Sequence, residues 1–102
     1  MSRGRDGDDA ARRGELGAIR WAFVQDPGDA LSKLVLLAMS TPANASFLCY
    51  MSHGKIAAKA NCHRRTVMRK IQRLLMMGLL KDVSADHLDR PTKTYRLCVD
   101  TE

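Results

Sequence analysis

The side chains best placed to do chemistry in this sequence are the cations between His53 and Lys81. This stretch of 29 residues contains no acid and eight cations, namely Lys55, Lys59, Arg64, Arg65, Arg69, Lys70, Arg73 and Lys81. The rest of the chain carries more acids than cations, so the whole net charge of +6 comes from this stretch. Concentrated guanidinium and ammonium groups attract polyanions, with an affinity and an association rate that fall with salt. The composition therefore favours a nucleic acid as partner, ahead of an acidic membrane surface.

Two predicted helices position these cations. Ser52 is suited to N-cap a helix over residues 53–60. A second helix is predicted over residues 63–77, and Gly78 ends it because glycine tolerates the left-handed conformation. The inward face of this second helix repeats at helical spacing and consists of Val67, Ile71, Leu74 and Leu75.

The corner between these helices has the residue types of a helix-turn-helix. Ala57 is small where the helices approach, Asn61 tolerates a positive φ, and Cys62 is apolar enough to fill the corner. Val67 is placed to point back at the first helix. In this motif the second helix enters the major groove of DNA with its N-terminal part against the base edges.

The outward face of the second helix carries the predicted base contacts, which are Arg64, Arg65, Met68, Arg69 and Gln72. Arginine bonds guanine bidentately, glutamine does the same for adenine, and a methionine can contact a thymine methyl. Thr66 is expected to support a phosphate contact or the helix start, while Lys55 and Lys59 suit phosphate contacts. The predicted DNA contacts are, in full, Lys55, Lys59, His63, Arg64, Arg65, Thr66, Met68, Arg69, Gln72, Arg73, Arg90 and Lys93.

One more helix is predicted before this pair. It runs from about Asp29 to Met39, is apolar nearly all round, and ends at Ser40-Thr41-Pro42. A helix of this kind lies either at the centre of the core or at an oligomer interface. Ahead of it, Trp21 and Phe23 alternate in a short segment that ends at Asp26-Pro27-Gly28, a turn and helix-start signal.

Short strands are predicted around the helix pair. A brief strand is expected over residues 47–50, and residues 79–84 and 93–99 form a hairpin whose connecting loop is 85–92. Tyr95, Leu97 and Val99 alternate onto one face of the last strand. The candidate DNA contacts of the hairpin are His87, Arg90 and Lys93. Together these elements predict an α+β, mainly α fold.

In this order the elements resemble the winged helix-turn-helix domains of phage and plasmid replication proteins and of small bacterial regulators. The resemblance covers roughly residues 20–98 and is carried by residues 21–25, 33–39, 56–57, 65–67, 74–80 and 94–97. It implies three helices plus a C-terminal β-hairpin wing, and sequence-specific binding of double-stranded DNA. It also implies a role in transcription regulation or in the replication and maintenance of a plasmid or phage. A homodimer on palindromic half-sites is expected. Departures at Met51, His53, His63 and Lys70 leave the target sequence open.

The predicted organisation is one domain over residues 18–99, with a disordered arm over 1–17 and a tail over 100–102. The arm is expected to be an inert solubilising tail rather than a minor-groove contact, because acids alternate with its arginines. The N-terminus is too polar for a signal peptide and no apolar run spans a bilayer, so a cytoplasmic protein is expected. The odd number of cysteines (Cys49, Cys62 and Cys98) predicts reduced thiols.

Other chemistry is weighed against DNA binding. Cys49, His53, Cys62 and His63 match no usual zinc spacing, so neither a metal nor another cofactor is expected. The two histidines are expected on the surface, where protonation at mildly acidic pH would strengthen DNA binding. The sequence has no carboxylate pair at useful spacing, no phosphate loop and no nucleophile motif, so no enzyme activity is expected. RNA binding would need more exposed aromatics.

A protein-interaction module stays open as the alternative function. The apolar first helix and the Met76-Met77 edge would then dock a larger replication or regulatory assembly. The acid-free face of the second helix separates the two interpretations, because a docking module does not need it.

Overall fold

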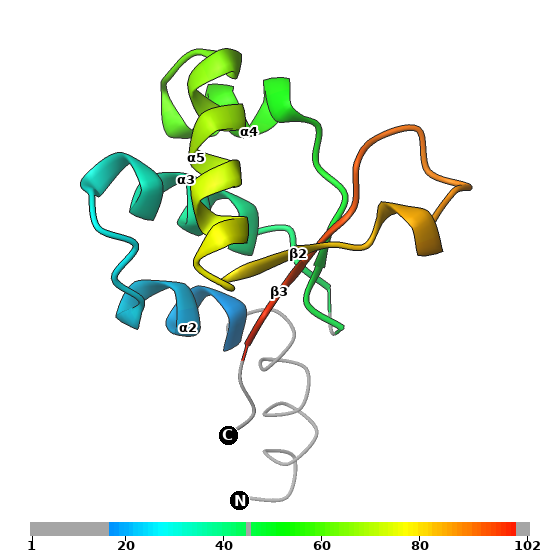
Figure 1. The fold of residues 1–102 in the computed structure, drawn as a ribbon, viewed down its shortest axis with the longest axis horizontal. Helices are drawn as coiled ribbons and strands as arrows, with labels where there is room; N and C mark the ends of the chain where they lie inside the picture. Colours follow the sequence, from blue (N-terminus) through cyan, green and yellow to red (C-terminus); the bar gives the residue numbers. More distant parts are fainter. Residues whose placement is uncertain (1–16, 45, 100–102) are drawn as a thin grey trace, which may run out of the picture.

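The computed structural model describes residues 17–44 and 46–99, which form an α+β, mainly helical fold (Figure 1). The elements in chain order are α2 (Ala18–Val24), α3 (Ala30–Ser40), β1 (Leu48–Cys49), α4 (His53–Ala60), α5 (Arg64–Met76), β2 (Leu80–Asp82), the 3-10 turn η2 (Ser84–Asp86) and β3 (Tyr95–Leu97). The mainly helical α+β class is as predicted. The predicted arm and tail lie outside the described residues, apart from Gly17, which precedes α2.

The prediction of three helices is wrong, because the described residues form four α-helices. The additional one is α2, in the segment where Trp21 and Phe23 alternate. Its buried residues are Ala18 and Ala22, which are four positions apart as on one helix face, whereas Phe23 is 60% exposed. The spacing of the two alanines therefore indicates the secondary structure of this segment better than the alternation of the two aromatics does.

α3 lies at the centre of the core and packs against α2, α4 and α5. Asp29 caps it by accepting a hydrogen bond from the Ser32 backbone N–H at 2.7 Å. At its other end Ser40 and Thr41 donate their hydroxyls to the carbonyls of Leu37 and Ala38, so the helix ends where predicted. Its buried side chains include Val35, Leu36 and Met39. The sequence predicted this helix either at the centre of the core or at an oligomer interface, and in the structure it lies at the centre of the core.

The joint between α4 and α5 has the predicted local structure. Ser52 caps α4 by accepting from the Lys55 backbone N–H at 3.2 Å. Asn61 has a φ of 56°, and the following Cys62 N–H donates to the Ala57 carbonyl at 3.0 Å. Gly78, with a φ of 79°, follows the end of α5. The positive φ angles of Asn61 and Gly78 and the hydrogen bond of Cys62 therefore determine the residues at which α5 begins and ends.

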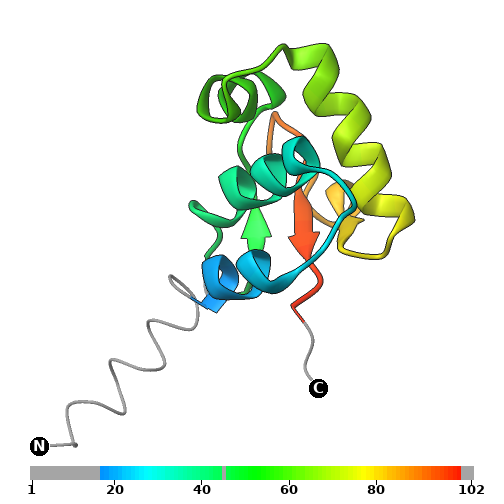
Figure 2. The same cartoon turned by 90° about the vertical axis from the view of Figure 1, so that its left-hand side faces the viewer.

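The three short strands form one antiparallel sheet in the order β1-β3-β2. Tyr95 and Leu97 of β3 are buried, whereas Arg96 between them is exposed and lies opposite Lys81. The strands are shorter than the predicted ones. β2 ends at Asp82, which accepts a hydrogen bond from the Ser84 N–H at 2.9 Å where the turn η2 begins. The helices gather on one side of the sheet, and the loop over residues 83–94 projects on the other (Figures 1 and 2).

The core joins both layers. Its buried side chains include Leu36, Ile56, Val67, Ile71, Leu74, Leu80, Tyr95 and Leu97. All three cysteines carry free thiols, and burial raises the pKa of the Cys49 thiol. Within the described residues, no helix is both long and apolar enough to cross a membrane.

Candidate nucleic-acid interface

The N-terminal part of α5 presents an exposed row of cations. Arg64, Arg65, Met68 and Arg69 are exposed, and Gln72 continues the row one turn further along. The opposite side of the helix is anchored in the core by Val67, Ile71 and Leu74. Within residues 17–44 and 46–99, no ion pair or hydrogen bond engages the side chains of this row. The five predicted base contacts therefore lie together on one accessible face, which we call the α5 face.

His63 and Thr66 flank the start of the α5 face. His63 stands at the N-cap position of α5 but makes no side-chain capping hydrogen bond, and it is exposed. Thr66 is half-buried, which fits the predicted supporting role better than a direct base contact. With Arg64 and Arg65 these residues line a hollow of about 430 Å³.

Lys70 and Arg73, nearer the C-terminal end of α5, are engaged within the fold. Lys70 Nζ lies 3.3 Å from the carboxylate of Asp29, and Arg73 Nε donates to the Pro27 carbonyl at 2.7 Å. Arg73 Nε is also 3.8 Å from the same Asp29 oxygen. Hydrogen bonds from Ser32, followed by Lys70, hold the pKa of Asp29 below its usual value. Arg73, one of the predicted DNA contacts, therefore ties α5 to the turn before α3.

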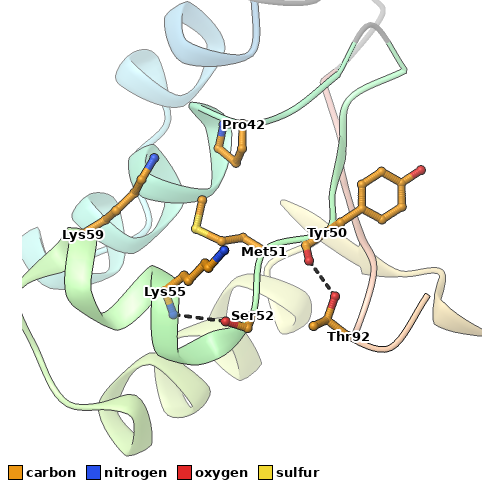
Figure 3. A pocket seen from close by; sticks show the side chains of 7 residues that line it. All are labelled: Pro42, Tyr50, Met51, Ser52, Lys55, Lys59 and Thr92. Atoms are coloured by element: carbon orange, nitrogen blue, oxygen red, sulfur yellow. Dashed lines mark hydrogen bonds between the residues drawn. The ribbon is translucent and has the colours of Figure 1, made fainter.

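Lys55 and Lys59 lie one turn apart on α4 and are exposed. Lys59 Nζ bonds the Thr41 hydroxyl at 2.9 Å, close to the end of α3. Both lysines line a hollow of about 700 Å³ together with Pro42, Tyr50, Met51, Ser52 and Thr92. Figure 3 shows the two lysines on one wall and the Tyr50 ring pointing away from them. They are accessible to an anion, as a phosphate contact requires.

The loop over residues 83–94 is fastened to Tyr50. Arg90 lies over the Tyr50 ring, 4.1 Å from its centroid, and the His87 ring meets the same ring edge-on. The Thr92 hydroxyl donates to the Tyr50 carbonyl at 2.6 Å. No local sequence signal indicates this role of Tyr50, because Thr92 lies 42 positions away.

The candidate contacts of this loop have partners of their own. Arg90 also lies 3.9 Å from Asp89, and Lys93 Nζ lies 3.1 Å from the Asp82 carboxylate. The Ser84 hydroxyl and Lys93 hold the pKa of Asp82 below its usual value. These exposed pairs are weak and exchange readily for other anions. Arg90 and Lys93 therefore remain available at the loop surface.

His53 stands where α4, α5 and β3 meet. Its Nε2 is 2.9 Å from the Tyr95 hydroxyl, and the two rings are stacked. Burial, and then the charges of Arg64 and Lys93, lower the pKa of His53. Burial raises the pKa of Tyr95 to about 12. His53 is half-buried rather than a fully exposed surface residue.

The four residues weighed as zinc ligands do not form a site. Across the described ranges, no group of three or more histidine, cysteine, aspartate or glutamate side chains is arranged to hold a metal ion. His53 is instead paired with Tyr95.

Comparisons with known proteins return no matching family model, no matching curated protein and no matching solved structure.

Proposed function

We propose that this chain is a winged helix-turn-helix domain that binds double-stranded DNA, with the α5 face in the major groove. The observation that carries the proposal is the row of exposed cations Arg64, Arg65 and Arg69, which have no acidic partner among the described residues. A row of unpaired like charges raises the free energy of the folded chain, and an anionic partner removes that penalty. The local joint at Asn61 supports the helix-turn-helix assignment.

The individual roles follow from side-chain chemistry. Arg64, Arg65 and Arg69 are proposed to bond guanine edges or phosphates, and Gln72 is proposed to bond adenine. Met68, 46% exposed between the arginines, suits a thymine methyl. Lys55 and Lys59, with His63 and Thr66 at the helix start, are proposed to contact phosphates, which orient the domain without selecting a sequence.

The hairpin of β2 and β3 is proposed as the wing. Its loop is held against Tyr50 at the edge of the same surface, and it carries Arg90 and Lys93. Exchange of their carboxylate partners for DNA phosphates would bring the loop to the backbone. Arg73 is not part of this proposed surface, because its guanidinium bonds Pro27.

The proposed biological role is transcription regulation or the replication and maintenance of a plasmid or phage, in a bacterial cytoplasm. A homodimer is proposed because one helix and one wing cover little DNA. Since α3 is buried, the proposed contact moves to the end of α2, where Phe23 is 60% and Val24 is 76% exposed. Sedimentation with and without DNA tests this, and a monomer under both conditions would exclude the dimer.

The test is fluorescence anisotropy with a random duplex and with a duplex selected for tight binding, titrated across salt. We expect the selected duplex to bind more tightly, and Arg65→Ala to remove about 1–3 kcal/mol of that preference. Arg73→Ala is the matched control, because it removes a cation of the same helix that is engaged within the fold. Weak binding that is equal for all sequences and unchanged by Arg65→Ala would exclude base recognition.

A docking module is the second candidate function, favoured by Met76 and Met77. They are 86% and 44% exposed at the end of α5, and methionine surfaces adapt to varied partners. This candidate predicts that Met76→Gln abolishes complex formation with a protein partner and leaves any DNA affinity unchanged. Tight sequence-selective DNA binding that depends on Arg65 would count against it.

A further inference from the structure

A groove of about 340 Å³ lies between the start of α5, the start of α4 and the end of the loop over residues 83–94. It is lined by Ser52, His53, Arg64, Met68, Pro91, Thr92 and Lys93. Ser52 and Thr92 also line the larger hollow that contains Lys55 and Lys59, so the two depressions adjoin. The groove therefore continues the basic surface of α4 toward the α5 face.

The charges around the groove come from separate elements. Arg64 belongs to α5, and Lys93 belongs to the segment before β3. His53 belongs to α4, lines the same groove and is hydrogen-bonded to the Tyr95 hydroxyl. Among the described residues, the acid that acts on His53 is Asp82 of β2, which is paired with Lys93 at 3.1 Å. The groove thus contains two cations and an imidazole, and Asp82 is already paired with one of the cations. The electrostatic potential inside the groove is therefore positive.

We propose that this groove takes one phosphate of the DNA backbone and that His53 takes up a proton as the phosphate binds, so that DNA affinity rises as the pH falls. The proposal rests on the proposed function. It differs from a general effect of acid, because it assigns the proton to His53 and not to His63 or His87, the other two histidines of the chain.

The physical reason lies in what surrounds His53 without DNA. Burial and the neighbouring cations Arg64 and Lys93 lower the pKa of His53 and so favour its neutral form, and Asp82 opposes them only in part. A phosphate between Arg64 and Lys93 brings a negative charge beside the ring and offsets both repulsions. If Lys93 leaves Asp82 for the phosphate, the freed carboxylate further favours the imidazolium. Binding of the anion and binding of the proton therefore strengthen each other.

The first experiment measures duplex affinity by anisotropy at constant ionic strength from about pH 7.5 to about pH 5.5, the range in which histidine titrates. We expect the affinity of the wild type to rise as the pH falls, by at most about tenfold for each unit by which DNA raises the pKa of His53. His53→Gln keeps a side chain able to bond the Tyr95 hydroxyl but cannot take the proton, so its affinity should stay flat with pH. His87→Gln, at a histidine that packs against Tyr50, is the matched control and should keep the wild-type slope.

The outcomes separate the two proposals. Absence of duplex binding at every pH would overturn both the proposed function and the His53 proposal. Tight binding with no pH dependence, or a slope that disappears in His63→Gln and persists in His53→Gln, would overturn only the His53 proposal.

A second measurement does not depend on how the variants fold. The ring signals of His53 in the wild type are titrated by NMR with no ligand, with duplex DNA and with inorganic phosphate at equal ionic strength. We expect a higher pKa of His53 with DNA and little change with inorganic phosphate, which lacks the other contacts of the duplex. An unchanged pKa with DNA would overturn the proposal, and an equal rise with inorganic phosphate would identify a free-anion site instead.

Discussion

The two ends of α5 carry similar cations in different circumstances. At the N-terminal end, Arg64, Arg65 and Arg69 are exposed and have no partner among the described residues. Toward the C-terminal end, Lys70 and Arg73 are held by Asp29 and the Pro27 carbonyl. The difference teaches that a count of cations on a helix does not give the charge available to a ligand. Availability depends on which cations meet a partner from elsewhere in the chain.

The partner of the C-terminal end is the turn over residues 26–29. Gly28 has a φ of 101°, and a Cβ at this position would collide with the Arg73 guanidinium. The turn therefore lies directly against α5, and Asp29 both caps α3 and faces Lys70. One short segment thus connects the start of α3 to the end of α5.

The largest expected effect is on DNA binding by the cations at the N-terminal end of α5. Replacing Arg64, Arg65 and Arg69 together by alanine should weaken binding to a selected duplex by about 3 kcal/mol or more, because each contact contributes about 1–3 kcal/mol. The double variant Lys70→Gln/Arg73→Gln removes two cations from the same helix and should keep most of the affinity. Anisotropy at fixed salt compares the two. Equal losses in both variants would mean that only total charge matters.

The next effect is on stability at the turn. Gly28→Ala should lower the free energy of unfolding by about 2 kcal/mol, because a left-handed backbone is costly for a residue with a Cβ and Arg73 must also move. Urea unfolding measures this. Gly54→Ala is the control, since a Cβ there meets open space within α4 and alanine favours helix. A neutral Gly28→Ala would show that the backbone at Gly28 is not held in the left-handed region.

A smaller loss of stability is expected from Arg73→Met, which keeps the length of the side chain. Loss of the bond to the Pro27 carbonyl should cost about 1 kcal/mol, less than for a buried charged group because water reaches half of the side chain. Arg65→Met should leave the free energy of unfolding nearly unchanged and should lower DNA affinity. If instead Arg65→Met lowered the free energy of unfolding and Arg73→Met lowered DNA affinity, the roles proposed for the two arginines would have to be exchanged.

The smallest effect concerns acid stability through Asp29. Its pKa is lowered in the folded chain, so the stability it contributes is fully present above the unfolded value of 3.8 and is lost as the pH falls through the folded value. Asp29→Asn lacks this contribution, and its stability should decline less than that of the wild type between about pH 5 and about pH 2. Asp82 titrates in the same window in both proteins, so the difference between the two urea curves isolates Asp29. Parallel curves would show that Asp29 is not stabilised by its partners.

The sequence by itself determined the joint that carries the α5 face. Ser52 caps the first helix and Asn61 takes a positive φ, each through its own backbone and near neighbours. The helical spacing of Val67, Ile71 and Leu74 also fixed which side of α5 faces water. Such signals are readable because they act within a few residues of one another.

Tertiary structure alone decided which cations remain free and how the loop is held. Arg73 meets Pro27 across 46 positions, Lys70 meets Asp29 across 41, and Thr92 meets Tyr50 across 42. α2 has no side-chain cap at Gly17, and its packing against α3 stabilises its conformation. No local pattern encodes these contacts, because they exist only when the folded core brings distant segments within bonding distance.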